Sequence, residues 1–215
     1  MNAQSTIDKI LEHKIIAIVR GVGKENIVKL GSALLEGGVK LIEVTFNQKD
    51  KDNLINTPLL IKTLIDTFGD KICVGAGTVM TEEQVEAAFN AGAKYMISPN
   101  TNEKVIKKTK ELGAVSIPGA LTPSESANAY EYGADFVKLF PAGNLGTGYI
   151  KSVCAPLNHI PFLAVGGINE VNVGDFMKTG IKGVGVGGNL CNLKLIENNE
   201  FDKITNSAKE YIENL

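Results

Sequence analysis

Phe136-Val137-Lys138-Leu139-Phe140-Pro141 has the pattern of a short buried strand that ends at a proline and carries a lysine at its centre. Alternate side chains of a strand share a face, so Lys138 points the same way as Phe136 and Phe140. Burial between apolar side chains removes water from the ammonium group, which lowers its pKa and favours the neutral amine. A neutral amine attacks a ketone to form an imine. The alternative is an edge strand from which Lys138 reaches water.

The composition is that of a globular protein with one hydrophobic core. The chain has 215 residues, enough for one domain that covers residues 1–215. Its net charge of -2 provides no basic surface for a nucleic acid. The segment from Met1 to Glu12 lacks an apolar signal core, and no apolar run of about 18 residues predicts a membrane span. We therefore expect a cytoplasmic protein without nucleic-acid or membrane partners.

Metal and cofactor motifs are missing from the sequence. Cys73, Cys154 and Cys191 are scattered without metal-ligand spacing, so we interpret them as buried or free thiols. His13 and His159 are the only histidines, and neither belongs to a paired motif. The glycines of Gly183-Val184-Gly185-Val186-Gly187 lie inside an expected strand and do not form a dinucleotide fingerprint. We expect no metal and no cofactor.

Short β-rich runs recur every 20 to 30 residues or so, each followed by a helix-length amphipathic segment, as in βα units with a parallel sheet. An additional helix near Ser5, with Ile7, Ile10 and Leu11 on one face, precedes the first run. The predicted strands are Ile15-Val19, Leu41-Thr45, Ile72-Val74, Tyr95-Ile97, Val115-Ile117, Phe136-Leu139, Phe162-Val165 and Val184-Val186.

Eight units in this length predict an α/β fold of the (β/α)8 TIM-barrel type with an extra N-terminal helix, because such barrels need about 200 residues or more. Thr81 with Gln84, and Thr122 with Glu125, fit capping boxes at helix starts. A doubly wound open sheet is the alternative, since strand order cannot be read from one sequence. In a barrel, the reactive groups belong at the C-terminal ends of the strands.

Glu43 lies in the middle of the second predicted strand, much as Lys138 lies in the sixth. A buried carboxylate without a partner is costly, so Glu43 either pairs with a helix lysine or faces the barrel interior with a raised pKa. In the second case it can exchange protons with a substrate. The presence of Lys138 in the same kind of position favours this functional interpretation for both residues.

Arg20 is the only arginine of the chain and ends the first predicted strand, on the face of Ile16 and Ile18. A guanidinium group can hold a carboxylate or phosphate through two parallel hydrogen bonds. We interpret Arg20 as an anion clamp, with an ordinary surface arginine as the alternative.

Glycine turns follow the last two predicted strands. Gly166-Gly167 and Gly187-Gly188-Asn189 occupy the place where barrels commonly bind phosphate through backbone N–H groups and a short helix N-terminus. The alternative is that they are plain tight turns.

From about Ile15 to Leu190 the chain resembles the class I 2-keto-3-deoxy-6-phosphogluconate (KDPG) and 4-hydroxy-2-oxoglutarate (KHG) aldolases, including the related 2-keto-3-deoxy-6-phosphogalactonate (KDPGal) aldolases. The motifs that carry the resemblance are Glu43-Val44-Thr45, Val74-Gly75-Ala76-Gly77-Thr78-Val79, Ile97-Ser98-Pro99, Ile117-Pro118-Gly119, Lys138-Leu139-Phe140-Pro141-Ala142 and Val165-Gly166-Gly167-Ile168.

The resemblance implies a role for each matching position. Lys138 would be the Schiff-base lysine and Glu43 the general acid and base. Thr78 and the backbone around Pro99 would hold the pyruvate carboxylate, and Phe140 would contact the substrate. The phosphate would bind at the last two glycine turns, Gly166, Gly167, Gly187, Gly188 and Asn189. The resemblance also implies a homotrimer.

The chain departs from the family pattern at Asn47, where many members carry an arginine for the carboxylate, and in this respect it resembles the KDPGal branch. We expect cleavage of KDPG to pyruvate and glyceraldehyde 3-phosphate, with KHG as a further substrate and KDPGal cleavage as the alternative. Thr45, Asn47, Asn100 and Asn189 are candidates for contacts near the C4 hydroxyl. A phosphate-binding barrel isomerase or synthase and a non-catalytic sugar-phosphate sensor are the alternatives from other classes.

Overall fold

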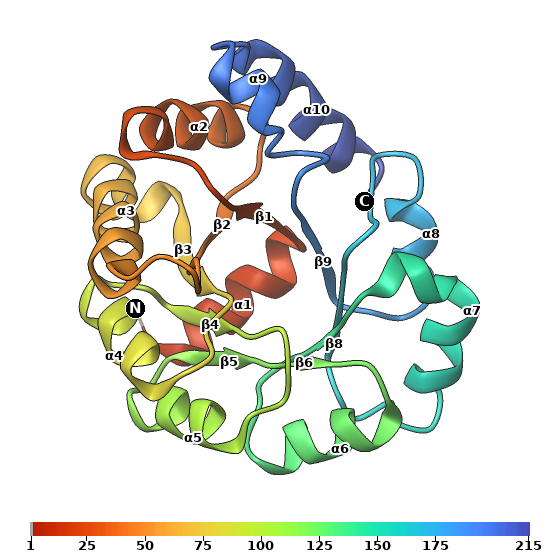
Figure 1. Cartoon of the computed structure of the whole chain (residues 1–215). Coiled ribbons are helices and arrows are strands. Elements are labelled where there is room, and N and C mark those ends of the chain that lie inside the picture. The colour runs from red at the N-terminus through yellow and green to blue at the C-terminus, as the bar shows by residue number, and fades with distance from the viewer. Residues whose placement is uncertain (1) are drawn as a thin grey trace.

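Short parallel strands form the centre of the computed structural model, which describes residues 2–215 (Figure 1). Their order in the sheet is β5-β4-β3-β2-β1-β9-β8-β7-β6, so that β1 pairs with both β2 and β9. The strands are β1 Ile15–Val19, β2 Leu41–Thr45, β3 Cys73–Gly77, β4 Tyr95–Ile97, β5 Val115–Ile117, β6 Gly119–Ala120, β7 Val137–Leu139, β8 Phe162–Val165 and β9 Gly183–Val186.

The two edges of this sheet are joined through Pro118, which closes the barrel. β5 pairs with β4 and β6 pairs with β7, and only Pro118 separates β5 from β6. Proline lacks an N–H and interrupts the ladder, but its carbonyl still accepts a hydrogen bond of 2.9 Å from the Lys138 N–H. The predicted fifth strand is therefore one barrel position broken into two segments, and the alternative of an open sheet was wrong.

Three other strands have bounds that differ from the prediction. β3 begins at Cys73 instead of Ile72 and continues to Gly77. β7 begins at Val137 instead of Phe136, and β9 begins at Gly183 instead of Val184. Glycines lowered the apparent strand propensity of the third and eighth runs, although their buried backbone pairs on both sides.

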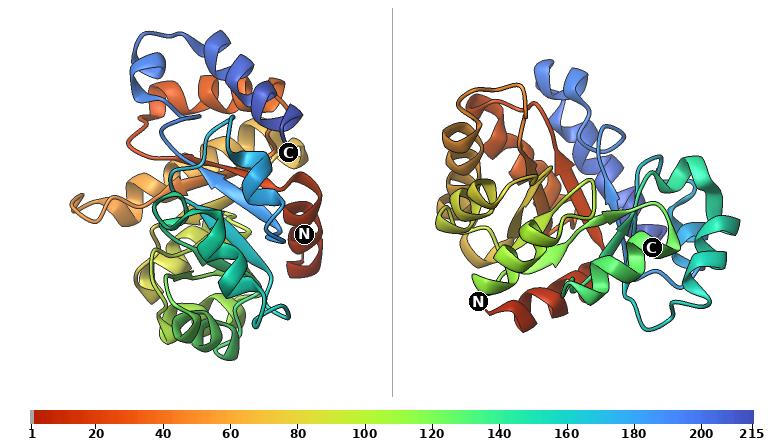
Figure 2. Two further views of the ribbon diagram at one scale, coloured as in Figure 1. Left: turned by 90° about the vertical axis from the view of Figure 1, so that its right-hand side faces the viewer. Right: turned by 60° about the horizontal axis from the view of Figure 1, so that its bottom comes forward.

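Helices follow each barrel strand and surround the sheet (Figure 1). None of the helices within residues 2–215 has the length and apolar character needed to cross a membrane. The helix α1 lies across one end of the barrel in both views of Figure 2. The helices are α1 Ala3–His13, α2 Lys24–Glu36, α3 Asn53–Phe68, α4 Glu82–Asn90, α5 Glu103–Glu111, α6 Pro123–Glu131, α7 Ala142–Cys154, α8 Val173–Met177, α9 Leu193–Glu197 and α10 Phe201–Glu213, with a 3-10 turn η1 at Gly69–Lys71.

The strands separate two apolar layers. Val137 and Leu139 of β7 pack outward against the helices, while Phe136 belongs to an inner cluster with Ile10 of α1. α1 therefore closes the N-terminal end of the barrel and leaves the opposite end open. The helix begins two residues before the predicted start, and Leu11 is 40% exposed because it lies on the outer side of the helix.

Capping side chains set the starts of α4 and α6. Thr122 and Glu125 form the predicted capping box at α6, with Pro123 in its first turn. At α4, Thr81 accepts from the Gln84 N–H as predicted, but the side chain of Gln84 accepts from the Met80 N–H instead of Thr81. That second capping box is therefore incomplete.

Candidate functional site

A cavity of about 480 Å³ opens at the C-terminal ends of the strands. It brings together eleven of the twelve site residues that the sequence predicted, all except Asn47, and includes residues from β1, β2, β7, β8 and β9. The lining residues are Ile18, Arg20, Glu43, Thr78, Pro99, Lys138, Phe140, Val165, Gly166, Gly167, Ile168, Gly185, Gly187, Gly188 and Asn189.

Lys138 occupies the inner face of β7 at the base of this cavity. Its side chain is 7% exposed, so the alternative of an edge lysine that reaches water was wrong. β7 lies between β6 and β8, with Lys138 in register with Gly119 and Leu163. Burial lowers the pKa of the Lys138 ammonium, Glu43 opposes this shift, and Arg20 adds to it. At a given pH, a larger fraction of Lys138 is therefore in the neutral amine form than for an exposed lysine.

Glu43 points inward from β2 and is 1% exposed. Burial raises the pKa of its carboxyl group, while the positive charges of Lys138 and Arg20 oppose the shift. Its Oε2 is the buried side-chain atom within residues 2–215 that has no hydrogen-bond partner in the protein. A buried carboxyl group with a raised pKa and an unused oxygen is suited to accept and return protons.

Gly77 makes room for the Glu43 carboxyl group. A Cβ atom at position 77 would overlap Oε1, Cδ and Cγ of Glu43. This role of Gly77 was not predicted from the sequence. The signal was the alternation of Gly75 and Gly77 on one face of β3, where Gly75 is in register with Glu43 itself.

Arg20 and Thr78 are hydrogen-bonded at the rim. The Arg20 Nη2 donates to Thr78 Oγ1 at 3.0 Å. Arg20 directly follows β1 and lines the cavity together with Ile18. Thr78 has a φ of 54°, which is strained for a β-branched residue by about 1–3 kcal/mol. The pair places a guanidinium group and a hydroxyl group on the same side of the cavity, which fits the binding of a carboxylate.

Phe140 covers the lysine. Its ring centroid lies 4.9 Å from Lys138 Nζ, a distance at which the ring face attracts a cation. The ring also packs over Gly166, where a Cβ atom would be 3.3 Å from the ring carbons. Phe140 can therefore contact both the amine and a molecule bound to it.

The two glycine turns differ in what requires glycine. Gly167 has a φ of 73° and approaches Gly143 closely, so the backbone itself excludes a side chain there. At Gly188 a Cβ atom would meet nothing within 4 Å, so protein packing does not require glycine. Asn189 Nδ2 donates to the Ile168 carbonyl at 2.8 Å and ties the two loops together.

The helix N-terminus expected beside these turns is already capped. Asn192 Oδ1 accepts from the N–H groups of Lys194 and Leu195 at the start of α9. Those N–H groups are therefore occupied, and the loop backbone is what remains for an anion.

Asn47 lies outside the cavity-lining set and is exposed. Its Oδ1 accepts from the Lys49 N–H at 3.1 Å, which stabilises the turn after β2. Thr45 is buried, and its Oγ1 donates to the Val19 carbonyl at 3.2 Å. Of the four candidates for contacts near a C4 hydroxyl, only Asn189 lines the cavity.

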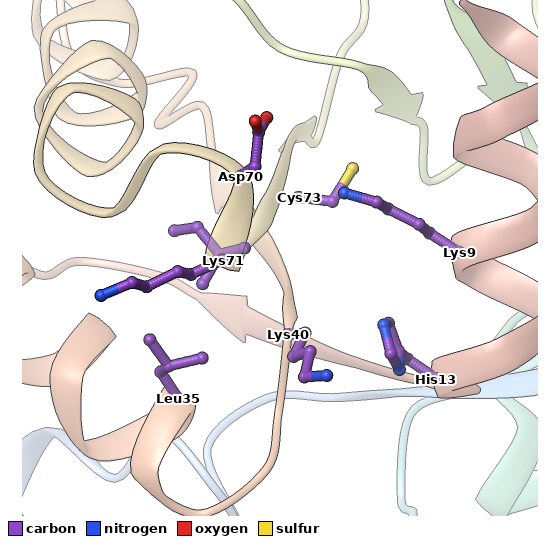
Figure 3. Close-up of a pocket in the computed structure, with 8 residues that line it drawn as sticks. Lys9, His13, Leu35, Lys40, Asp70, Lys71 and Cys73 are labelled. Carbon is purple, nitrogen blue, oxygen red and sulfur yellow. The ribbon is translucent and has the colours of Figure 1, made fainter. Parts of the chain in front are cut away.

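A second cavity of about 470 Å³ lies at the opposite end of the barrel (Figure 3). Lys9, His13 and Lys40 line it together with Cys73. Burial raises the pKa of the Cys73 thiol to about 11, so the thiol stays protonated at neutral pH. Burial lowers the pKa of His13, and Lys40 and Lys9 add to this effect.

Comparisons with known proteins match the chain to one family of aldolases. The family described as KDPG and KHG aldolase matches residues 6–207. A 2-dehydro-3-deoxy-6-phosphogalactonate aldolase of Escherichia coli (strain K12) is 32% identical over 177 residues, 82% of this chain and 83% of the relative. The KHG/KDPG aldolase of the same organism is 32% identical over 192 residues, 88% of this chain and 86% of the relative.

A solved structure has the same fold. The KDPG aldolase of Legionella pneumophila, with pyruvate captured as a covalent carbinolamine intermediate, superposes with a TM-score of 0.82 and 26% identity. The alignment covers 93% of this chain and 95% of that one.

Proposed function

We propose that this chain, which belongs to the KDPG and KHG aldolase family, cleaves KDPG to pyruvate and glyceraldehyde 3-phosphate through a Schiff base on Lys138. The observation that carries the proposal is the burial of Lys138 and Glu43 in one cavity, with opposite shifts of their pKa values. The other classes considered, an isomerase or synthase and a sugar-phosphate sensor, give no reason for a buried lysine beside a buried carboxyl group.

Imine formation begins with attack of the neutral Lys138 amine on the C2 ketone. Glu43 transfers protons to the carbinolamine oxygen, which leaves as water, and a protonated imine results. Arg20 and Thr78 hold the adjacent carboxylate of the substrate. Phe140 faces the positive charge of the iminium.

Carbon–carbon cleavage then uses the imine as an electron acceptor. Glu43, directly or through water, takes the proton of the C4 hydroxyl, and the electrons of the C3–C4 bond move to the iminium to give an enamine. The aldehyde leaves. Protonation of the enamine at C3 and hydrolysis of the imine release pyruvate and restore Lys138.

The glycine turns support a phosphorylated substrate. The open backbone at Gly187 and Gly188, with Gly166 and Gly167 across the same cavity, fits a phosphate at the far end of the sugar acid. A distal phosphate adds binding energy that can be used in the transition state, so KDPG should exceed KHG in kcat/KM.

KDPGal is the second candidate substrate, because the only arginine of the chain stands at position 20 and Asn47 lies outside the cavity. The similarity to the E. coli phosphogalactonate aldolase supports the same candidate. The two substrates are epimers at C4, so few polar contacts distinguish them. Measurements of kcat/KM on both substrates decide which is preferred. A kcat/KM for KDPGal more than about 100-fold higher, about 2.7 kcal/mol, would make KDPGal the proposed substrate in place of KDPG.

Reductive trapping tests the mechanism. Pyruvate with borohydride should add a stable adduct to Lys138, found by peptide mass mapping, and Lys138→Ala should abolish both the adduct and turnover. An adduct at another lysine, or none, would reject the Schiff-base assignment.

We further propose a cytoplasmic homotrimer. The family resemblance supports the assembly, and the exposed apolar side chains of Leu54, Ile55 and Leu59 on α3 offer a surface for it. The three free cysteines fit a reducing compartment. Light scattering on the purified protein measures the mass, and a monomer at micromolar concentration would contradict the assembly.

A further inference from the structure

Gln48 and Gln84 form a hydrogen-bonded chain that ends at the cavity. The Met80 N–H donates to Gln84 Oε1 at 2.8 Å, and Gln84 Nε2 donates to Gln48 Oε1 at 3.0 Å. Gln48 Nε2 then donates to the Thr78 carbonyl at 2.7 Å. The three segments come from the loop after β2, the loop after β3 and the start of α4 (Figure 1).

The direction of this chain is set by its two ends. A backbone N–H can only donate, and a backbone carbonyl can only accept. The Met80 N–H therefore requires the oxygen of Gln84, which leaves the amide NH2 of Gln84 facing Gln48. Gln48 must in turn present its oxygen to Gln84 and its NH2 to Thr78, so each amide has one orientation.

Thr78 needs such support because of its backbone conformation. Its φ of 54° is left-handed, which a β-branched residue adopts only where the surroundings hold it. The Thr78 hydroxyl accepts the hydrogen bond from Arg20, so a change in this conformation would move both groups. Gln84 is 3% exposed, and its buried amide gives the chain a rigid anchor.

We propose that Gln48 and Gln84 are positioning residues for substrate binding. They hold Thr78 in its left-handed conformation and, through it, keep Arg20 aimed at the substrate carboxylate. The inference rests on the proposed function of the cavity, in which Arg20 and Thr78 bind that carboxylate.

The test uses two variants that break the chain differently. Gln48→Met removes the donor to Thr78 at an exposed position without adding charge. Gln84→Glu keeps the acceptor for Met80 but has no N–H for Gln48, which must then turn its oxygen toward the Thr78 carbonyl. Gln4→Met is the matched control, because Gln4 is a glutamine on α1 whose amide, within residues 2–215, hydrogen-bonds to Asp8 alone.

Gln48→Met and Gln84→Glu should each raise the pyruvate concentration needed for half-maximal borohydride trapping about tenfold, which is the effect of losing one hydrogen bond. KM should rise by a similar factor while kcat stays within about twofold, because the carboxylate is bound equally before and during cleavage. Gln4→Met should match the wild type in all three measurements.

Half-saturation at the wild-type pyruvate concentration in both variants would overturn the positioning role. A fall in kcat as large as the rise in KM, together with a lowered Tm, would also overturn it, because it would show that the glutamines support the fold alone. Failure of the wild type itself to trap pyruvate at Lys138 would instead reject the proposed function, so the two failures are distinguishable.

Discussion

Gly77→Ala tests whether the position of Glu43 depends on the absence of a side chain at residue 77. The added Cβ atom would overlap the carboxyl group of Glu43. To restore the 3.0 Å that real Cβ atoms keep from their neighbours, Oε1 must move by roughly 1.3 Å. A displacement of about 1 Å at a reacting group costs on the order of 100-fold in rate, about 2.7 kcal/mol.

We therefore expect kcat/KM of Gly77→Ala to fall by about 100-fold, with a loss of about 1–3 kcal/mol in the free energy of unfolding from overpacking. The assay measures pyruvate release, with thermal unfolding to show that the variant is folded. Gly148→Ala is the control, because a Cβ atom at this position in α7 meets nothing within 4 Å. Unchanged kcat/KM in Gly77→Ala would refute the assignment of Glu43 as the proton-transfer group held by Gly77.

Three further predictions follow from the electrostatics and the donor groups of the cavity. Glu43→Gln removes the charge that raises the pKa of Lys138, so the pH below which imine trapping is lost should fall. Arg20→Met removes a charge that lowers this pKa, so the same pH limit should rise. Shifts of the limit in the same direction in both variants would contradict this assignment. Arg20→Lys keeps the positive charge but cannot make two parallel hydrogen bonds, so the fall in kcat/KM should correspond to a loss of about 1–3 kcal/mol. An unchanged kcat/KM would make Arg20 an ordinary rim residue. EDTA should leave activity unchanged, and activity restored by a divalent ion after chelation would point to a metal-dependent aldolase.

The sequence by itself determined the repeating βα units and the chemistry of the strand ends. Period-two alternation placed Lys138, Glu43 and Arg20 on one face of their strands, because successive side chains point to opposite sides of a strand. The lysine and the carboxylate are unusual in apolar runs, so each was recognisable without knowledge of its neighbours.

Only the tertiary structure decided which of these groups meet. The closure through Pro118 cannot be read from the chain, because proline disrupts the local ladder while the neighbouring strands restore the pairing from both sides. Asn47 comes two residues after the end of β2, a position typical of site residues in a barrel. Its side chain instead accepts a hydrogen bond from the Lys49 N–H in the same turn. The roles of Gly77 and Gln84 depend on side chains from other strands and loops. The alternation of Gly75 and Gly77 indicates that one face of β3 lacks side chains, but it does not show which side chain from another strand fills that space.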